Sequence, residues 1–363
     1  MKKTVSAILL MLLIMNMCAC TENPSSSEDD INKENPPIVE IGGEDENENT
    51  DVFAQDEIPP APEVIFTSAD ESFVMKVGDK EITEAMFRYY LLNYAKQYGG
   101  DNEKFWEEQA IKSIKKYVAT EALSDKIGVV LGDDEKDYYT YLIDYTVDKY
   151  NTTPGTSYEK ALENMYLTDA LSRSMIESGL RANMLYNEYI TEGGKMYNAT
   201  DKDIFSYIKD NYVRVKHILI KTVDLDDTQK AEARKRAEKV CDQAMSGYDF
   251  EELIKQYSED TMDVETGYYF TRGEKVQVFE NKAYELKNGE VSDIVESAYG
   301  YHIIKRYDHD RDYVLSDKTL RSTALSSICE KAYATDVEIV AQGLKVQYYP
   351  TYRQVKEKIL AER

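Results

Sequence analysis

The spacing of apolar residues predicts a helical region in the first half of the folded chain. A short hairpin pattern covers residues 73–82, around Gly78 and Asp79. Apolar residues then recur every three or four positions in four stretches, 83–98, 101–127, 134–151 and 157–193. Many of these positions are tyrosines, which favours either amphipathic packing or an adaptable surface for contacting unfolded chains.

The pattern changes near residue 201, where helical and strand periods begin to alternate. Between 213 and 308 the predicted order is strand, helix, helix, strand, helix, strand, strand, which describes a compact α+β unit. Helical patterning returns after residue 316 and continues to the end of the chain. The fold class is therefore predicted to be α+β, with helical N- and C-terminal parts around one compact mixed domain.

The first twenty residues indicate a secretory signal. Lys2 and Lys3 precede an almost wholly apolar run that ends at Met15 and is too short to span a bilayer. Cys20 follows a small residue, as in a bacterial lipobox, although Met17 stands where that motif usually has leucine. We expect Cys20 to carry a lipid anchor, because a diacylglyceryl group supplies the two chains that stable anchoring needs. The alternative is an ordinary secreted protein with a cysteine near its cleavage site.

Residues 21–72 are strongly acidic and rich in proline. They hold 16 aspartates and glutamates against one lysine, and six of the eight prolines of the chain precede residue 63. Such a segment cannot bury enough apolar surface to offset its conformational entropy, so we expect a disordered tether. The whole chain has a net charge of −24, and the part after the tether is still moderately acidic. This argues against nucleic acid or anionic lipid as a ligand.

Two of the three histidines lie within predicted strands, His217 in "VRVKHILIK" and His302 in "YGYHIIKR". Between them come "FEELIKQYSED", "YYFTRGE" and "AYELKNGEVSDIVES", in that order. Together these stretches resemble the parvulin family of peptidyl-prolyl isomerases over residues 213–308. The wider plan, including the opening "VMKVGDKEIT", resembles PrsA-type extracellular foldases and, more distantly, SurA-like chaperones. The third histidine, His309, is expected on the surface.

The resemblance implies the domain organisation. We expect a lipoprotein signal peptide at 1–20, the acidic linker at 21–72, a helical chaperone domain at 73–208, a parvulin domain at 209–312, and C-terminal helices at 313–363. By the same resemblance, the C-terminal helices would pack on the N-terminal domain. The cysteine spacing shows no zinc site and leaves one disulfide between Cys241 and Cys329 open.

The resemblance also implies a catalytic network that needs no metal, nucleophile or cofactor. His217 and His302 would lie side by side on the central sheet within one hydrogen-bonded network. Ser297 and Asp260 match further members of that network. The alternative is that the two histidines are a structural pair holding the strands together.

The residues expected to bind substrate are Phe270, Lys275 and Phe279. By resemblance, Phe279 would line the proline pocket and Phe270 would form its hydrophobic wall. Lys275 stands where parvulins usually have methionine, and a cation beside a proline ring is costly to desolvate unless its ammonium reaches outward. Three aspartates in "KTVDLDDTQ" (221–229) stand where phosphate-dependent parvulins have arginines, so we expect no phosphate requirement.

Three functional hypotheses follow. The first is a lipid-anchored foldase on the extracellular face of the cell membrane, which isomerises X-Pro bonds in unfolded secreted polypeptides. The second is a non-catalytic chaperone with a degenerate parvulin domain, and Lys275 is the feature that separates these two. The third is a structural surface lipoprotein that holds a dedicated partner. The sequence leaves the clients and the oligomeric state, including a homodimer, open.

Overall fold

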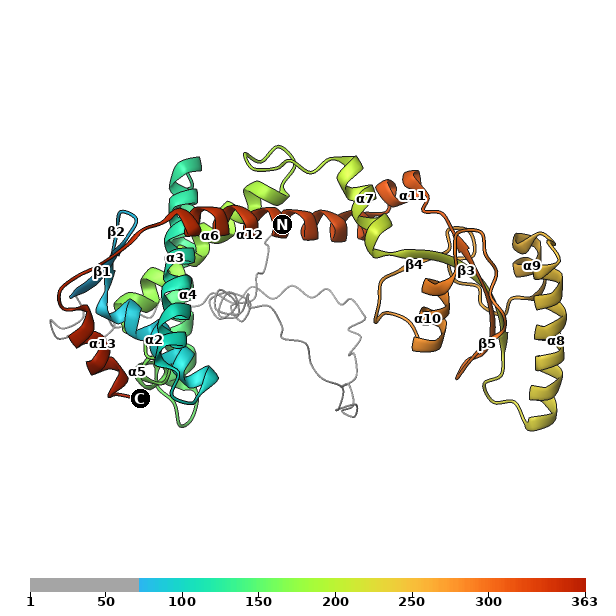
Figure 1. The fold of residues 1–363 in the computed structure, drawn as a ribbon, viewed down its shortest axis with the longest axis horizontal. Coiled ribbons are helices and arrows are strands. Elements are labelled where there is room, and N and C mark those ends of the chain that lie inside the picture. Colours follow the sequence, from blue (N-terminus) through green and yellow to red (C-terminus); the bar gives the residue numbers. More distant parts are fainter. Residues whose placement is uncertain (1–71) are drawn as a thin grey trace, which may run out of the picture. The chain divides into compact units, whose positions relative to one another are not determined.

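A computed structural model describes residues 72–363 of the protein. The expected signal peptide, the lipidation site Cys20 and the linker up to residue 71 lie outside the described residues. Within 72–363, no helix is both long enough and apolar enough to cross a membrane. The described chain forms two compact units, one from 72–182 with 339–363 and the other from 183–338 (Figure 1).

The first unit contains a three-stranded antiparallel sheet. β1 (Phe73–Val77) forms the predicted hairpin with β2 (Lys80–Thr83), and Gly78 turns the chain between them at φ +58°. β1 also pairs on its other side with β7 (Val346–Tyr348), which follows some 270 residues later. The hairpin is confirmed, whereas β7 replaces part of a region that the sequence pattern predicted to be helical.

The helices of this part of the chain are α2 (Glu84–Tyr98), α3 (Glu103–Ile127), α4 (Asp133–Thr152), α5 (Tyr158–Asn164), α6 (Asp169–Ile190), whose last residues belong to the second unit, and α13 (Tyr352–Leu360). Of these, α2, α3 and α13 pack against the sheet. Side chains cap several of them at the N-terminus, as when the Thr83 hydroxyl accepts a hydrogen bond from the Met86 N–H. The predicted helix over 157–193 is broken between α5 and α6. Tyr166 adopts a left-handed φ of 58° there, and the Thr168 hydroxyl accepts a hydrogen bond from the Leu171 N–H as α6 begins.

The C-terminal residues complete the core of the first unit. Ile359 of α13 is fully buried in the cluster that contains Phe87 of α2 and Trp106 of α3. The sequence prediction assigned all of 313–363 to C-terminal helices that pack on the N-terminal domain, whereas the structure divides this segment between the two units. Most of α12 (Lys318–Gly343) belongs to the second unit, because Leu320 and Ala324 share an apolar cluster with Ile204 and Ile208 of α7.

The second unit contains the α+β region. Its elements before α12 are α7 (Asp201–Asn211), β3 (Val213–Lys221), α8 (Asp227–Met245), α9 (Phe250–Tyr257), β4 (Tyr268–Phe270), α10 (Gln277–Glu285), β5 (Val295–Ser297), β6 (Gly300–Tyr307) and α11 (Arg311–Ser316). The strands form an antiparallel sheet in the order β4-β3-β6-β5. The predicted order of elements from 213 to 308 is therefore confirmed.

Alternation along the two central strands separates the faces of this sheet. Ile218 and Ile220 of β3, with Tyr301 and Ile303 of β6, pack against α8 and α9. Residues of the opposite parity, including Val213, Val215 and Ile304, pack against α10. Figure 1 shows α10 on one side of the sheet and α8 with α9 on the other. The face that packs against α10 also carries both strand histidines.

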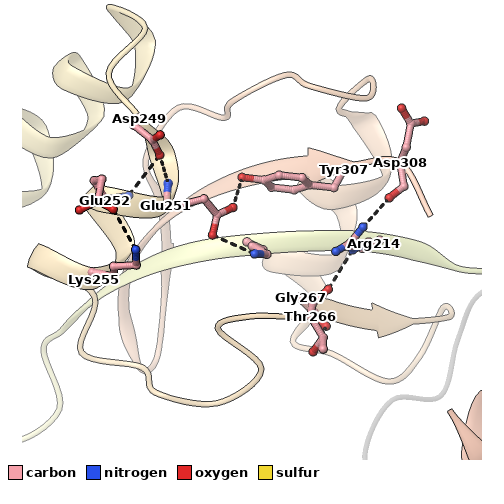
Figure 2. A network of polar contacts seen from close by, with 10 residues as sticks. Arg214, Asp249, Glu251, Glu252, Lys255, Thr266, Gly267, Tyr307 and Asp308 are labelled. Carbon is pink, nitrogen blue, oxygen red and sulfur yellow. Dashed lines mark hydrogen bonds and ion pairs between the residues drawn. The ribbon is translucent and has the colours of Figure 1, made fainter. Parts of the chain in front are cut away.

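A polar network attaches α9 to the sheet (Figure 2). The buried Lys216 ammonium lies 2.8 Å from the Glu251 carboxylate, which also accepts a hydrogen bond from the Tyr307 hydroxyl at 2.8 Å. Asp249 caps α9 by accepting hydrogen bonds from the N–H groups of its first turn. Arg214 donates to the carbonyl oxygens of Thr266 and Asp308. The charged side chains of this network have ion-pair or hydrogen-bond partners, so we interpret the network as a structural attachment of α9 to the sheet.

Candidate active site

The pairing register brings the two strand histidines together. His217 pairs with Ile304, and His302 pairs with Leu219, so the two imidazoles are diagonal neighbours on the α10 face. Their Nδ1 atoms lie 3.1 Å apart, and the ring planes are within 12° of parallel. Gly300 begins β6 at φ +145°, where a Cβ would collide with the Ile220 carbonyl oxygen. The close approach of β3 and β6 near His302 thus depends on glycine.

A serine and an aspartate extend the histidine pair at its two ends. The Ser297 Oγ lies 2.7 Å from His302 Nε2, and the Asp260 Oδ2 lies 2.9 Å from His217 Nε2. An ionised carboxylate can only accept, so neutral His217 donates from Nε2 and accepts at Nδ1. His302 must then donate from Nδ1 and accept the Ser297 proton at Nε2. The four side chains form one continuous hydrogen-bonded chain with a defined direction.

Asp260 is held as an anion by several donors. Its Oδ2 also accepts a hydrogen bond from the Tyr268 hydroxyl at 2.8 Å, and its Oδ1 accepts one from the Met262 N–H at 3.1 Å. Burial acts to raise the pKa of this carboxyl. The hydrogen bonds from Met262, Tyr268 and His217 outweigh burial and hold its pKa below the usual value. Asp260 is therefore ionised at neutral pH.

Both histidines are neutral at pH 7. Burial lowers the pKa of His217, against the opposing effect of Asp260, and the nearby Lys275 lowers it further. Burial and the neighbouring His217 lower the pKa of His302 to about 4. Neutral rings agree with the direction of the hydrogen-bonded chain, which needs one proton on each imidazole.

Aromatic rings surround the histidine pair. The Phe279 ring stands nearly perpendicular to both imidazoles, with its centroid 5.2 Å from that of His217 and 5.3 Å from that of His302. Tyr268 makes a similar edge contact with His217 at 5.4 Å. Phe270 is fully buried, and its ring packs against that of Phe279 with the centroids 6.0 Å apart.

Lys275 lies at the rim of this group with its side chain exposed. Its Nζ is 4.6 Å from the centroid of the Tyr268 ring and 5.9 Å from that of Phe270. A cation over an aromatic face is stabilised by the ring quadrupole without losing its water. The ammonium therefore avoids the desolvation that a buried position beside the histidines would require.

The structure thus brings four of the predicted site residues, His217, Asp260, Ser297 and His302, into one network. Phe279 contacts the two histidines directly, whereas Phe270 lies one layer deeper and Lys275 lies at the exposed edge. The sequence reasoning missed Tyr268, which contacts both Asp260 and His217. Its signal was the aromatic run "GYYF".

Comparison with known proteins identifies the mixed domain. Residues 196–310 match the family model of the PPIC-type PPIase domain. The chain contains a parvulin-type peptidyl-prolyl isomerase domain. The parvulin fold expected from residues 213–308 is therefore confirmed, and the match begins somewhat before the predicted boundary at 209.

Two proteins that this chain is similar to are named foldases. It is 39% identical to foldase protein PrsA 1 of Bacillus cereus over 144 residues, which cover 38% of this chain and 43% of the relative. It is 29% identical to foldase protein PrsA of Geobacillus kaustophilus over 216 residues, covering 58% and 69%. The chain thus spans less than half of the first relative and about two thirds of the second.

A crystal structure of PrsA from Bacillus cereus covers 82% of this chain and 93% of its own, at 23% identity and a TM-score of 0.27. That score is too low to indicate a shared arrangement of the whole chain.

Proposed function

We propose that the protein is a foldase, a peptidyl-prolyl cis-trans isomerase and chaperone that assists the folding of secreted proteins outside the cytoplasmic membrane. The observation that carries this proposal is the continuous chain from Ser297 through His302 and His217 to Asp260. The PPIC-type match over 196–310 and the PrsA relatives support isomerase activity.

Prolyl isomerisation requires no covalent step. Rotation about an amide has a barrier of about 18–20 kcal/mol, and a thousandfold acceleration needs only about 4 kcal/mol of preferential transition-state stabilisation. The Phe279 ring offers the proline an apolar contact. Moving the amide out of water disfavours its charge-separated planar form relative to the twisted form. The fixed dipoles of the neutral imidazoles and the Asp260 anion then bias the remaining electrostatics.

The same proposal includes the anchor and the location. Lys2 and Lys3, the apolar run after them and the Ala19-Cys20 junction support a lipoprotein signal. In this account Cys20 is acylated, the acidic linker of 21–72 acts as a tether, and the folded units act at the extracellular face of the cell membrane.

Substrates in this account are unfolded or partly folded secreted polypeptides with X-Pro bonds. Asp224, Asp226 and Asp227, which follow β3, disfavour phosphorylated segments by charge repulsion. The alternative function is a non-catalytic chaperone that only holds clients. The exposed ammonium of Lys275 favours the isomerase, because the lysine adds no buried charge beside the histidines.

Refolding of a protein limited by a slow X-Pro isomerisation separates the two functions, because that phase takes tens of seconds or longer without catalysis. The isomerase predicts that the full chain accelerates the slow phase, and that His217→Ala abolishes the acceleration while His309→Gln retains it. A higher refolding yield with an unchanged slow rate would instead support the chaperone alone.

A further inference from the structure

Lys275 forms no ion pair with a carboxylate among the described residues. Its ammonium contacts only the faces of Tyr268 and Phe270, and no residue of 72–363 forms an ion pair with it. The nearby Arg272 differs, because its guanidinium lies 3.8 Å from the Glu280 carboxylate and stacks on Tyr284 at 3.9 Å. Lys275 is thus an available cation beside the histidine network.

The Tyr268 ring, over which the Lys275 ammonium lies, is held in place by its own contacts. The Tyr268 hydroxyl donates to Asp260, and the edge of the Tyr268 ring contacts His217. The ring that holds the Lys275 ammonium is therefore part of the same network as the imidazoles. A preorganised charge loses less side-chain entropy on binding than a freely moving lysine would.

Neighbouring carboxylates are already committed to other donors. Asp260 accepts hydrogen bonds from three groups, as described above. Glu274 accepts from the Thr271 N–H, and the buried Glu280 accepts from the Gly273 N–H. These carboxylates keep their negative charges, but none of them forms an ion pair with Lys275, so its exposed ammonium can pair with a ligand.

The acidic segment after β3 is too distant to cancel the charge. Tyr268, under the ammonium, pairs with Val215, six residues before Lys221 at the end of β3. At about 3.3 Å per residue this places the start of the acidic segment roughly 20 Å farther along the strand. Such a distance exceeds the screening length of about 8 Å at physiological salt.

We propose that Lys275 is a specificity-determining residue, which selects X-Pro segments that carry an acidic side chain next to the proline. The inference rests on the proposed isomerase function and refines its substrate class. A glutamate or aspartate beside the proline pairs with the fixed ammonium, whereas a lysine or arginine at the same place is repelled. Selection by charge thus depends on the lysine that stands where parvulins usually have methionine.

The test compares kcat/KM of the full chain for matched peptides. One pair has glutamate or glutamine directly before the proline, and a second pair has them directly after it. An exposed ion pair predicts a preference of about threefold for one glutamate peptide over its glutamine twin. The preference should disappear in Lys275→Met, reverse in favour of the glutamine peptide in Lys275→Glu, and weaken in high salt. The control Lys239→Met removes the same charge from the exposed face of α8 and should keep the preference.

Equal rates for both members of each pair in the wild type would overturn the inference, as would a preference that survives in Lys275→Met. If no peptide is isomerised at all, the proposed function fails, and binding of the same peptides measured by NMR shift changes decides the role of Lys275 separately. Tighter binding of a glutamate peptide that is lost in Lys275→Met would support selection by charge. Equal binding would refute it.

Discussion

His217 and His302 face each other across two paired strands with their Nδ1 atoms 3.1 Å apart. Such a contact needs one donor and one acceptor, so two protonated imidazoles cannot share it. The anion of Asp260 at one end and the hydroxyl of Ser297 at the other fix which nitrogen carries each proton. The pair is therefore both a link between strands and a set of oriented dipoles, and the two roles are not exclusive.

Stability should fall in mild acid because of His302. Its pKa of about 4 lies below the ordinary 6.5, so between these values the unfolded chain binds a proton that the folded chain does not. The free energy of unfolding should decrease as the pH falls from about 6.5 to about 4, by up to about 3 kcal/mol from this group, and then level off. Urea unfolding at a series of pH values measures this. In His302→Gln the fall should be much smaller, and an unchanged slope would contradict the assignment.

Replacing Asp260 with asparagine should lower the pKa of His217 further. In the wild type the carboxylate raises this pKa against the effect of burial. Asp260→Asn removes that opposition, which NMR titration of the ring nitrogens would detect. Loss of a charged hydrogen bond should also reduce kcat/KM by roughly tenfold. A His217 pKa that rises or stays constant would show that the carboxylate does not control the imidazole.

Tyr268→Phe tests the residue that sequence reasoning missed. Without the phenol hydroxyl, Asp260 loses one of its donors, so the pKa of Asp260 should rise. The free energy of unfolding should fall by about 1.5 kcal/mol. The carboxyl carbon shift of Asp260 reports the first effect. The neighbouring Tyr269→Phe is the control, because the Tyr269 hydroxyl accepts from the Asp310 N–H outside the network. Identical Asp260 titrations in both variants would rule out a role for Tyr268.

The C-terminal helix α13 should be essential to the first unit. Ile359→Ala removes a fully buried side chain from its core and should lower the free energy of unfolding by about 2–4 kcal/mol. Ile339→Ala, at a position that is 62% exposed, should change it by less than about 0.5 kcal/mol. Urea unfolding compares the two variants. Equal effects would mean that α13 does not complete this core.

Local sequence patterns were sufficient to predict the central strands and the histidines within them. The alternation in 213–221 and around His302 predicts half-buried strands, and the parvulin resemblance then relates His217, Asp260, Ser297 and His302 to one network. His217 and His302 lie within strongly patterned strands, and Asp260 and Ser297 each end one of the quoted stretches between them. This part of the site was therefore accessible from the sequence.

Long-range contacts explain what the sequence reasoning did not find. β7 is a strand of only three residues, and its pairing with β1 across the length of the chain determines its conformation. His309 was expected on the surface but is half-buried, because its ring contacts Tyr269 and its Nε2 lies 3.0 Å from the Tyr212 carbonyl oxygen. Cys241 and Cys329 are both buried free thiols with different partners, the carbonyl oxygens of Ser292 and Tyr189. The disulfide that the sequence allowed between them is therefore not formed in this structure.

The central claim is that the Ser297–His302–His217–Asp260 network lies in an active isomerase site. Exchange NMR on a proline peptide tests it most directly, because it detects cis-trans interconversion without a coupled protease. With a small amount of the full chain, the account predicts exchange peaks between the cis and trans signals for the wild type, and much weaker ones for His302→Ala. Absence of exchange with the wild type, or equal exchange with both proteins, would contradict it.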